Sequence, residues 1–201
     1  NGGGAIWDTV LSSTVTENTY NIVQCTGVGI LSLVLRIDEG VSVADFGAVG
    51  DGVTDDTAAF QACFDAHSTV HIPAGTYLIT SQVNLVRDRM RIWGDSINTR
   101  IKFEPTANAT CFYLEKTALD ASVQHHISDM AFFSSDTTYK KIALELVDFS
   151  WSKFDNLMTI SPMWFGNGSI FLQCRGRDTS SFSNLRIEAD QCIRISPIPV
   201  S

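Results

Sequence analysis

Short runs of residues with β-strand length follow one another along the chain from Val70 onward. Each run is rich in apolar residues and is bounded by Gly, Pro, Asp, Asn or Ser, as strands usually are. The clearest runs are Val70–Ile72, Tyr77–Thr80, Val83–Val86, Met90–Trp93 and Arg100–Phe103. A second helical period does not appear in this part of the sequence. We therefore predict a fold that is nearly all β.

One amphipathic helix is predicted before these strands, over residues 56–66. Its apolar residues recur at spacings of three and four, which gives the helix one buried face. They are Ala59, Phe60, Cys63 and Phe64. Thr54 or Asp55 suits the N-cap, and Asp56 suits the positive end of the helix dipole. Three glycines between residues 47 and 52 supply positive-φ positions for a tight turn before the helix.

A repeat of 27 and 28 residues is the strongest sign of the architecture. Three segments share an apolar residue, a small or acidic residue, Asp or Asn, and then Met or Leu. They are Ile127–Phe132, Phe154–Thr159 and Phe182–Ile187. Such a period is typical of a coil of parallel strands, in which each turn buries its inner face only by stacking on its neighbours.

A second set of strands repeats in step with the first. Residues 142, 144 and 146 match residues 170, 172 and 174 at an offset of 28, and residues 112 and 114 are placed 30 residues before Ile142 and Leu144. Ile193 and Ile195 follow after a shorter interval of 23. In this register Asp129, Asn156 and Asn184 stack at one bend. A structural ladder of side-chain hydrogen bonds is favoured there over a catalytic role.

Residues 1–40 differ from the rest and are predicted to form a separate attachment or oligomerisation segment. Residues 20–23 are a possible strand, and the alternation from Leu31 to Ile37 is typical of a half-buried one. So short a segment can hardly bury a core of its own, so we expect it to pack on other chains or on the coil. Residues 41–201 are assigned to the first turns of the coil, with further turns expected after Ser201.

The segments Val43–Phe60 and Val70–Tyr77 carry a family resemblance. They resemble the opening of the pectate-lyase-like single-stranded right-handed β-helix, which is used in bacteriophage tailspikes and polysaccharide depolymerases. The resemblance implies a mainly β fold, a right-handed parallel β-helix, preceded by the small attachment segment. It also implies a homotrimer. The helix over residues 56–66 is predicted to be an N-terminal capping α-helix, because the open end of a parallel coil exposes apolar side chains and unpaired backbone groups.

Composition narrows the possible partners. The net charge of −8 and the lack of clustered Lys and Arg argue against nucleic-acid binding. The longest apolar stretch, Gly27–Leu35, falls short of the roughly 20 residues that span a bilayer, so no membrane insertion is expected. Five widely spaced cysteines are interpreted as buried apolar residues rather than disulfides. No cofactor and no metal are predicted, and the adjacent His125 and His126 are interpreted as structural.

Two pairs of carboxylates are candidates for catalysis. Glycoside hydrolysis needs two carboxyl groups about 5 to 9.5 Å apart, and adjacent turns of a parallel coil lie about 4.8 Å apart. Glu115 and Glu145 are placed outward on neighbouring turns, and Glu188 and Asp190 on one strand. Outward carboxylates are also ordinary on any acidic protein, so the alternative of no catalytic role stays open.

Other residue types suggest weaker possibilities. A lyase would need a basic residue and a group that neutralises a uronate; the available residues are Lys140, Lys141, Arg175 and Arg177. Flat side chains that could stack on sugar rings, or lie in the core or at subunit contacts, are Trp93, Trp151, Trp164 and Phe165.

The favoured hypothesis is a virion tailspike or tail-fibre-like protein, assembled in the host cytoplasm. It would bind phage tail or baseplate proteins through residues 1–40 and present its β-helix to host surface polysaccharide. Any depolymerase activity is expected in later turns or between subunits. The alternatives are a secreted polysaccharide hydrolase or lyase of the same fold, and a structural β-helix that binds another protein.

Overall fold

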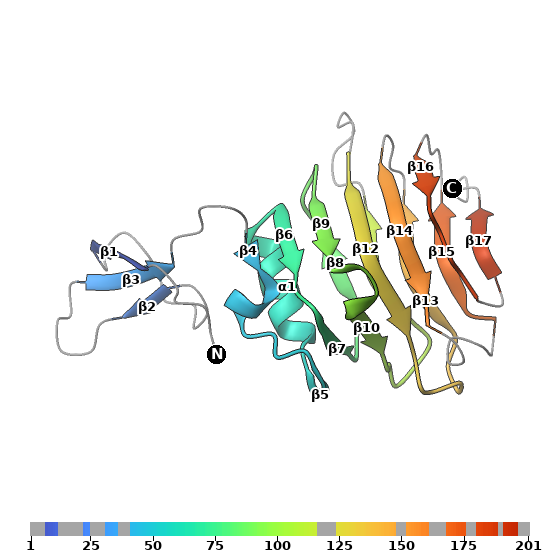
Figure 1. Cartoon of the computed structure of the whole chain (residues 1–201), viewed down its shortest axis with the longest axis horizontal. Coiled ribbons are helices and arrows are strands. Elements are labelled where there is room, and N and C mark those ends of the chain that lie inside the picture. Colours follow the sequence, from blue (N-terminus) through green and yellow to red (C-terminus); the bar gives the residue numbers. More distant parts are fainter. Residues whose placement is uncertain are drawn as a thin grey trace, which may run out of the picture.

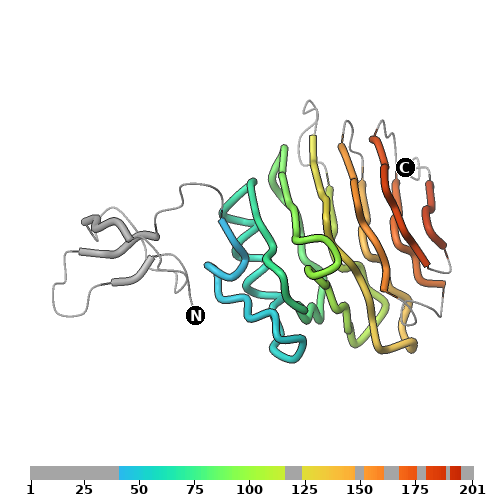
Figure 2. Tube along the Cα trace, viewed as in Figure 1, coloured from blue at the N-terminus to red at the C-terminus, as the bar shows by residue number. Residues whose placement is uncertain are grey.

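The structure is a computed structural model, and it describes residues 7–11, 22–24, 31–35, 41–115, 124–147, 152–160, 168–175, 180–188 and 191–196. From Val41 onward the chain winds as a coil of parallel strands, and successive turns lie side by side along its length (Figures 1 and 2). The strands stack into three ladders. This arrangement is a parallel β-helix, as the repeat predicts.

The first ladder begins with β4 (Val41–Ser42), β6 (Thr69–Ile72) and β9 (Arg91–Gly94), and continues through the first halves of β12 (His126–Phe133) and β14 (Lys153–Thr159) to β16 (Ser181–Ser183). The second ladder contains β5 (Asp51–Asp55), β7 (Gly75–Ile79), β10 (Thr99–Phe103) and the second halves of β12 and β14. The third contains β8 (Val83–Leu85), β11 (Ala109–Glu115), β13 (Lys141–Val147), β15 (Ile170–Arg175) and β17 (Gln191–Ser196). Besides the strands, the described residues of this part form the helix α1 (Thr57–Ala66) and the 3₁₀ helices η2 (Val43–Phe46) and η3 (Ser96–Asn98).

The predicted repeat is confirmed by the strand register. Ile127 pairs with Phe154, and Phe154 pairs with Phe182, all in parallel. The rings of Phe154 and Phe182 stack with centroids 5.3 Å apart and planes 17° apart. In the third ladder Leu144 pairs with Leu172, which confirms the offset of 28.

Two other predicted offsets are wrong by two residues. Phe112 pairs with Leu144, so the offset is 32 and not 30. Leu172 pairs with Ile193, so the last offset is 21 and not 23. Side chains alternate with period two along a strand, so a shift of two leaves the inward residues inward. The apolar pattern therefore does not distinguish the two registers.

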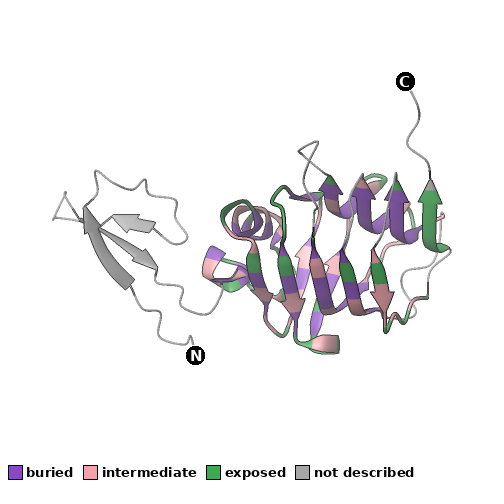
Figure 3. Ribbon diagram, turned by 90° about the horizontal axis from the view of Figure 1, so that it is seen from above, coloured by how far each residue is buried: buried purple, intermediate pink, exposed green. Residues whose placement is uncertain are grey.

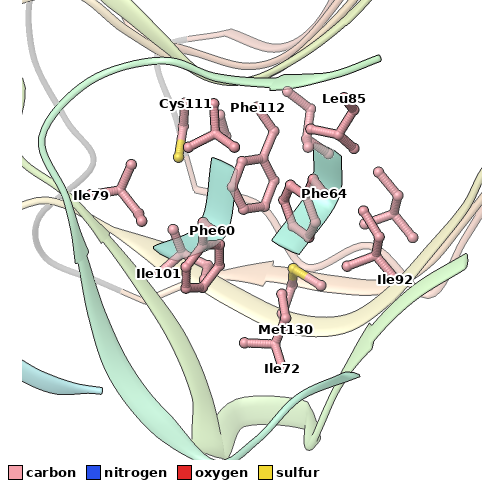
Figure 4. Packing of buried hydrophobic residues seen from close by; sticks show 14 of the residues in the cluster. Phe60, Phe64, Ile72, Ile79, Leu85, Ile92, Ile101, Cys111, Phe112 and Met130 are labelled. Atoms are coloured by element: carbon pink, nitrogen blue, oxygen red, sulfur yellow. The ribbon is translucent and has the colours of Figure 1, made fainter. Parts of the chain in front are cut away.

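The core is an apolar column inside the coil, and aromatic rings link its turns. Phe112 lies within 6.2 Å, centroid to centroid, of Phe60, Phe64 and Phe132, and Phe132 lies 5.7 Å from Phe171. Figure 4 shows Phe112 beside Phe60 and Phe64 among aliphatic residues from several turns. Buried positions make up most of β12, β13 and β15, whereas the described side chains of β17 are exposed (Figure 3).

The predicted helix is present as α1 (Thr57–Ala66), with Ala59, Phe60, Cys63 and Phe64 buried. Asp55 accepts a hydrogen bond from the backbone N–H of Thr57 at 3.0 Å. The Asp56 carboxylate instead accepts from the N–H groups of Val49 and Gly50, at 2.7 and 3.3 Å. Burial raises the pKa of Asp56 above its ordinary value. The helix packs on η2 and β8, and its role as an end cap stays a prediction.

The glycine-rich turn before α1 has the predicted conformation. Gly47, Gly50 and Gly52 have φ values of 94°, 69° and 78°. At Gly50 a Cβ would also lie 2.9 Å from the Tyr77 ring, so only glycine meets both the steric and the backbone requirement.

The three stacked polar residues occupy one bend, between the first and second ladders. Asp129, Asn156 and Asn184 all have positive φ, at 61°, 49° and 52°. Asn156 Nδ2 donates to Asp129 Oδ1 at 2.8 Å, while Asn184 Nδ2 donates to Asp155 Oδ1 at 2.8 Å. Asn and Asp adopt the left-handed region more readily than other non-glycine residues, which explains why they recur at this bend.

We expect Asn156→Ala to lower the free energy of unfolding by about 2 kcal/mol, because it loses the hydrogen bond and places alanine in the left-handed region. Asn156→Gly loses the same hydrogen bond without the backbone strain, so it should cost only about 1 kcal/mol. Urea unfolding measures both variants. Equal losses would contradict a conformational role for this bend.

Residues before Val41 contribute three described strands, β1 (Trp7–Leu11), β2 (Ile22–Gln24) and β3 (Leu31–Leu35). They pair antiparallel in the order β1-β3-β2. The two strands predicted in residues 20–37 are therefore confirmed as elements. Attachment through residues 1–40 stays a prediction, as does the domain boundary. Among the described residues no helix is long and apolar enough to cross a membrane.

Candidate functional site: a pocket on the outer face of the third ladder

A column of polar side chains runs along the outer face of the third ladder. Its members occupy paired positions on successive strands: Asn84, Tyr113, Glu145, Gln173 and Arg194. They lie outward because their neighbours along each strand, such as Leu144 and Leu146, are buried in the core. The regular strand spacing therefore fixes these polar groups in one rigid column. Glu145 and Gln173 are buried, Asn84 and Tyr113 are half-buried, and Arg194 is exposed.

Glu145 is the central residue of this column and is 5% exposed. Thr110 Oγ1 donates a hydrogen bond to its Oε2 at 2.5 Å. Arg175 Nη2 lies 2.5 Å from Glu145 Oε1, so the two side chains form an ion pair. Among the described residues no donor has the geometry of a hydrogen bond to this Oε1 atom. A carboxylate buried this deeply needs such an opposite charge nearby.

Gln173 fixes the guanidinium from another side. With its amide oxygen facing the donors, Gln173 accepts from Arg175 Nε at 2.8 Å and from Nη2 at 3.1 Å. The Arg175 side chain is still 45% exposed, compared with 6% for the Glu145 side chain. Arg175 is therefore held from one side by protein groups and faces solvent on the other.

A pocket of about 330 Å³ opens over this pair. It is lined by Asn108, Ala109, Thr110, Lys140, Ile142, Glu145 and Arg175. The backbone N–H of Lys140 donates to Asn108 Oδ1 at 2.9 Å, which joins the loops of two successive turns. The wall of the pocket is thus built from neighbouring turns of the coil.

The loop that carries Lys140 is anchored by the buried Lys141. Lys141 Nζ lies 3.3 Å from Asp136 Oδ2 and donates to the carbonyl oxygens of Asp136 and Tyr139, the second at 3.2 Å. On the other side of this loop, Ser135 donates to Glu104 Oε1 of the preceding turn. Lys141, one of the basic candidates, therefore has structural contacts, whereas Lys140 lines the pocket.

The structure does not place Glu115 opposite Glu145. Glu115 pairs with Val147, and Tyr113 pairs with Glu145, because the offset is 32 residues. Glu115 is exposed, and the Tyr113 hydroxyl donates to its Oε2 at 3.2 Å. Burial, followed by the charge of Glu115, raises the pKa of Tyr113. The two glutamates share the outer face, but they do not face each other directly.

Glu188 lies at a different place, beside a smaller pocket of about 160 Å³ lined by Ile97, Met158, Thr159, Ile160, Arg186 and Glu188. Its backbone N–H donates to Thr159 Oγ1 at 2.7 Å, and its side chain is exposed. Asp190 lies outside the described residues, so the structure does not test that pair.

Of the other predicted candidates, Trp93 is half-buried and stacks on His71 with ring centroids 5.4 Å apart. The Arg91 guanidinium lies 5.2 Å from the centroid of the Trp93 ring. His125 Nδ1 accepts from the backbone N–H of Met90, in keeping with a structural role. Trp151, Trp164, Phe165 and Arg177 lie outside the described residues. Groups of acidic, His or Cys residues that could hold a metal ion are not found in the described part.

Sequence reasoning missed the grouping of Thr110, Lys140 and Arg175 around Glu145. The offset of 28 already placed Gln173 beside Glu145, and Arg175 is two positions further on the same face. Thr110 is 35 residues from Glu145, and its approach depends on the correct offset of 32 together with a diagonal contact. Of these three residues, only Arg175 could have been placed near Glu145 from the sequence repeat.

The fold and the elongated outer face define a class, the parallel β-helix proteins of the pectate-lyase type. Residues 40–165 match the family described as rhamnogalacturonase A/epimerase, pectate lyase-like, and the chain belongs to this family.

Curated relatives match over short segments. The preneck appendage protein of Bacillus phage PZA is 38% identical over 64 residues, which cover 32% of this chain and 8% of that protein. The mannuronan C5-epimerase AlgE5 of Azotobacter vinelandii is 54% identical over 44 residues, covering 19% of this chain and 4% of that protein. The matches thus span less than a tenth of either relative.

Solved structures share the fold over a larger part of the chain. The enzymatically active domain of tailspike protein 2 from bacteriophage CBA120 has a TM-score of 0.75 and 16% identity, covering 97% of this chain and 31% of that one. Tailspike gp61 of Pseudomonas phage phi297 has a TM-score of 0.55 and 14% identity, covering 82% and 50%. At these identities the likeness concerns the fold.

Proposed function

We propose that this chain is part of a phage tailspike or tail-fibre-like virion protein whose β-helix binds host surface polysaccharide. The phage appendage protein among the relatives and the tailspikes among the solved structures support this assignment. The observation that carries it is the polar column of the third ladder with its pocket at Glu145. An elongated, repeating ligand suits a surface on which side chains repeat at every turn.

In this proposal residues 1–40 attach the protein to the phage tail or baseplate, and the protein acts as a homotrimer. The three described strands β1, β2 and β3 form a sheet too small to be stable alone, which favours contacts with other chains. Light scattering after size exclusion of the intact protein should give the mass of three chains. A monomer at micromolar concentration would contradict the trimer.

Binding is tested with the intact protein on an array of bacterial surface polysaccharides. We expect one or a few glycans to retain the protein, and Arg175→Gln to reduce the signal at least about tenfold, since a charge-assisted contact is lost from the pocket. Arg100→Gln, an exposed arginine on the second ladder, is the matched control and should bind like the unmodified protein. If no glycan is retained while a protein partner is, the chain is instead a structural β-helix.

The alternative is a secreted polysaccharide hydrolase or lyase of the same family, with Glu115, Glu145, Glu188 and Asp190 as candidate catalytic residues. The observation in its favour is the buried Glu145 carboxylate beside a basic group in a pocket. It predicts release of reducing ends from an acidic polysaccharide, and Glu145→Gln should abolish this release while binding persists. If folded Glu145→Gln still releases reducing ends, Glu145 is not a catalytic residue. Any depolymerase activity would then lie in later turns of the β-helix.

A further inference from the structure

We infer that the pocket binds one anionic substituent of a sugar, through Arg175 and Lys140, and that Glu145 is a positioning residue for Arg175 rather than an acid or base. The inference rests on the proposed polysaccharide binding and specifies what this pocket contacts. The substituent is a carboxylate, sulfate or phosphate group, since all three present oxygen pairs or triplets to a guanidinium.

Glu145 and Arg175 differ in how far their side chains are buried, and this difference indicates which of them contacts a ligand. The Glu145 side chain is 6% exposed, and its two oxygens are directed to Thr110 and Arg175. Glu145 lines the pocket, but both of its carboxylate oxygens are already in contact with protein groups. The Arg175 side chain is 45% exposed, so the guanidinium is the part of the pair that a ligand can reach.

The contacts of Arg175 leave donors for a ligand. Glu145 lies against Nη2, and Gln173 accepts from Nε and Nη2. Nη1 takes part in none of these contacts. All three contacts lie on the edge of the guanidinium formed by Nε and Nη2. They fix the orientation of the guanidinium before a ligand binds, which lowers the entropy cost of binding.

Lys140 supplies a second cation to the same pocket. Its backbone is fixed by Asn108, and its ammonium group forms no ion pair among the described residues. The pocket volume of about 330 Å³ lies at the lower end of the range for ligand sites, roughly 300 to 1,000 Å³. It therefore suits one charged sugar unit rather than a long segment of chain.

The first test needs no knowledge of the natural polysaccharide. The Arg175 Nε–H resonance is followed by NMR in the intact protein during separate titrations with sodium glucuronate, sodium sulfate, inorganic phosphate and glucose. We expect saturable shifts with at least one anion and none with glucose. Sodium chloride at matched ionic strength is the control for screening. Absence of a saturable shift with every anion, or an equal shift with glucose, would overturn the inference.

Variants separate binding from positioning. Isothermal titration calorimetry with the anion that binds measures the variants, because Arg175→Gln lacks the Nε–H signal. Arg175→Gln and Lys140→Gln should each weaken binding of that anion about tenfold, whereas Arg100→Gln and Lys153→Gln, on other ladders, should not. In Glu145→Gln the Arg175 Nε–H should exchange faster with water and show greater motion by ¹⁵N relaxation, because its charged partner is gone. An unchanged Arg175 signal in that variant would contradict the positioning role.

The source of the anion is tested on the glycan that the array identifies. Carboxyl reduction, desulfation and dephosphorylation are applied separately, and one treatment should remove at least nine-tenths of the binding. If the protein binds its glycan and all three treated forms are bound equally well, the proposed function stands and this inference fails. If no glycan binds but the titration of Arg175 succeeds, the pocket is an anion site and the polysaccharide function fails.

Discussion

Phe112→Ala is expected to lower the free energy of unfolding by about 3 to 5 kcal/mol, the usual cost of removing a fully buried phenylalanine. Phe112 has no exposed surface and joins three other rings, two from α1 and one from the next turn. The variant loses the transfer free energy of the ring and leaves a cavity between the helix and the coil. Urea unfolding measured by tryptophan fluorescence and by circular dichroism gives the value.

Two controls accompany this variant. Phe112→Leu fills most of the space and should cost about 2 kcal/mol or less. Tyr113→Ala removes a similar ring one position along the same strand, where the side chain lies outward and half-buried, and should cost about 1 kcal/mol. If Phe112→Ala costs no more than Tyr113→Ala, then α1 and the coil do not share a core.

The architecture followed from the sequence wherever the apolar period was uninterrupted. Ile127, Phe154 and Phe182 are paired as predicted because identical bends, with Asp or Asn in the left-handed region, keep the turns equal in length. The helix at residues 57–66 followed from its spacing of three and four. These signals are local, or they repeat with a fixed period, so a single sequence contains them.

The pocket was predictable only in part. Its outward carboxylate followed from alternation, but the partners of Glu145 depend on the lengths of the loops that separate the third-ladder strands. The pattern gave the offset between β13 and β15 correctly, but it gave the offset between β11 and β13 with an error of two residues, which exchanges Tyr113 for Glu115 opposite Glu145. An even shift preserves burial and changes only which polar side chains meet. Side-chain partners on the outer face are therefore less predictable than the core.

Acidification should destabilise the protein between pH 6.5 and 4 through His125. This residue is 4% exposed, and its Nδ1 accepts from the backbone N–H of Met90 at 3.2 Å, which requires the neutral ring. Burial lowers the pKa of His125 from 6.5 to about 4, although the negative charge of Asp88 acts in the opposite direction. Between these two values the unfolded chain binds a proton that the folded chain does not, so stability falls as the pH decreases.

The expected size of this loss is about 3 kcal/mol, since each pKa unit corresponds to roughly 1.4 kcal/mol. His126 and His67 also have lowered pKa values, so the His125 contribution must be measured as a difference between variants. His125→Asn offers its Oδ1 to the Met90 N–H and does not titrate. Urea unfolding gives the free energy of unfolding of both proteins at pH 7 and at pH 4. On going from pH 7 to pH 4, the unmodified protein should lose about 3 kcal/mol more than the variant does. An equal pH dependence for both proteins would show that His125 is protonated in the folded state and that Met90 has another acceptor.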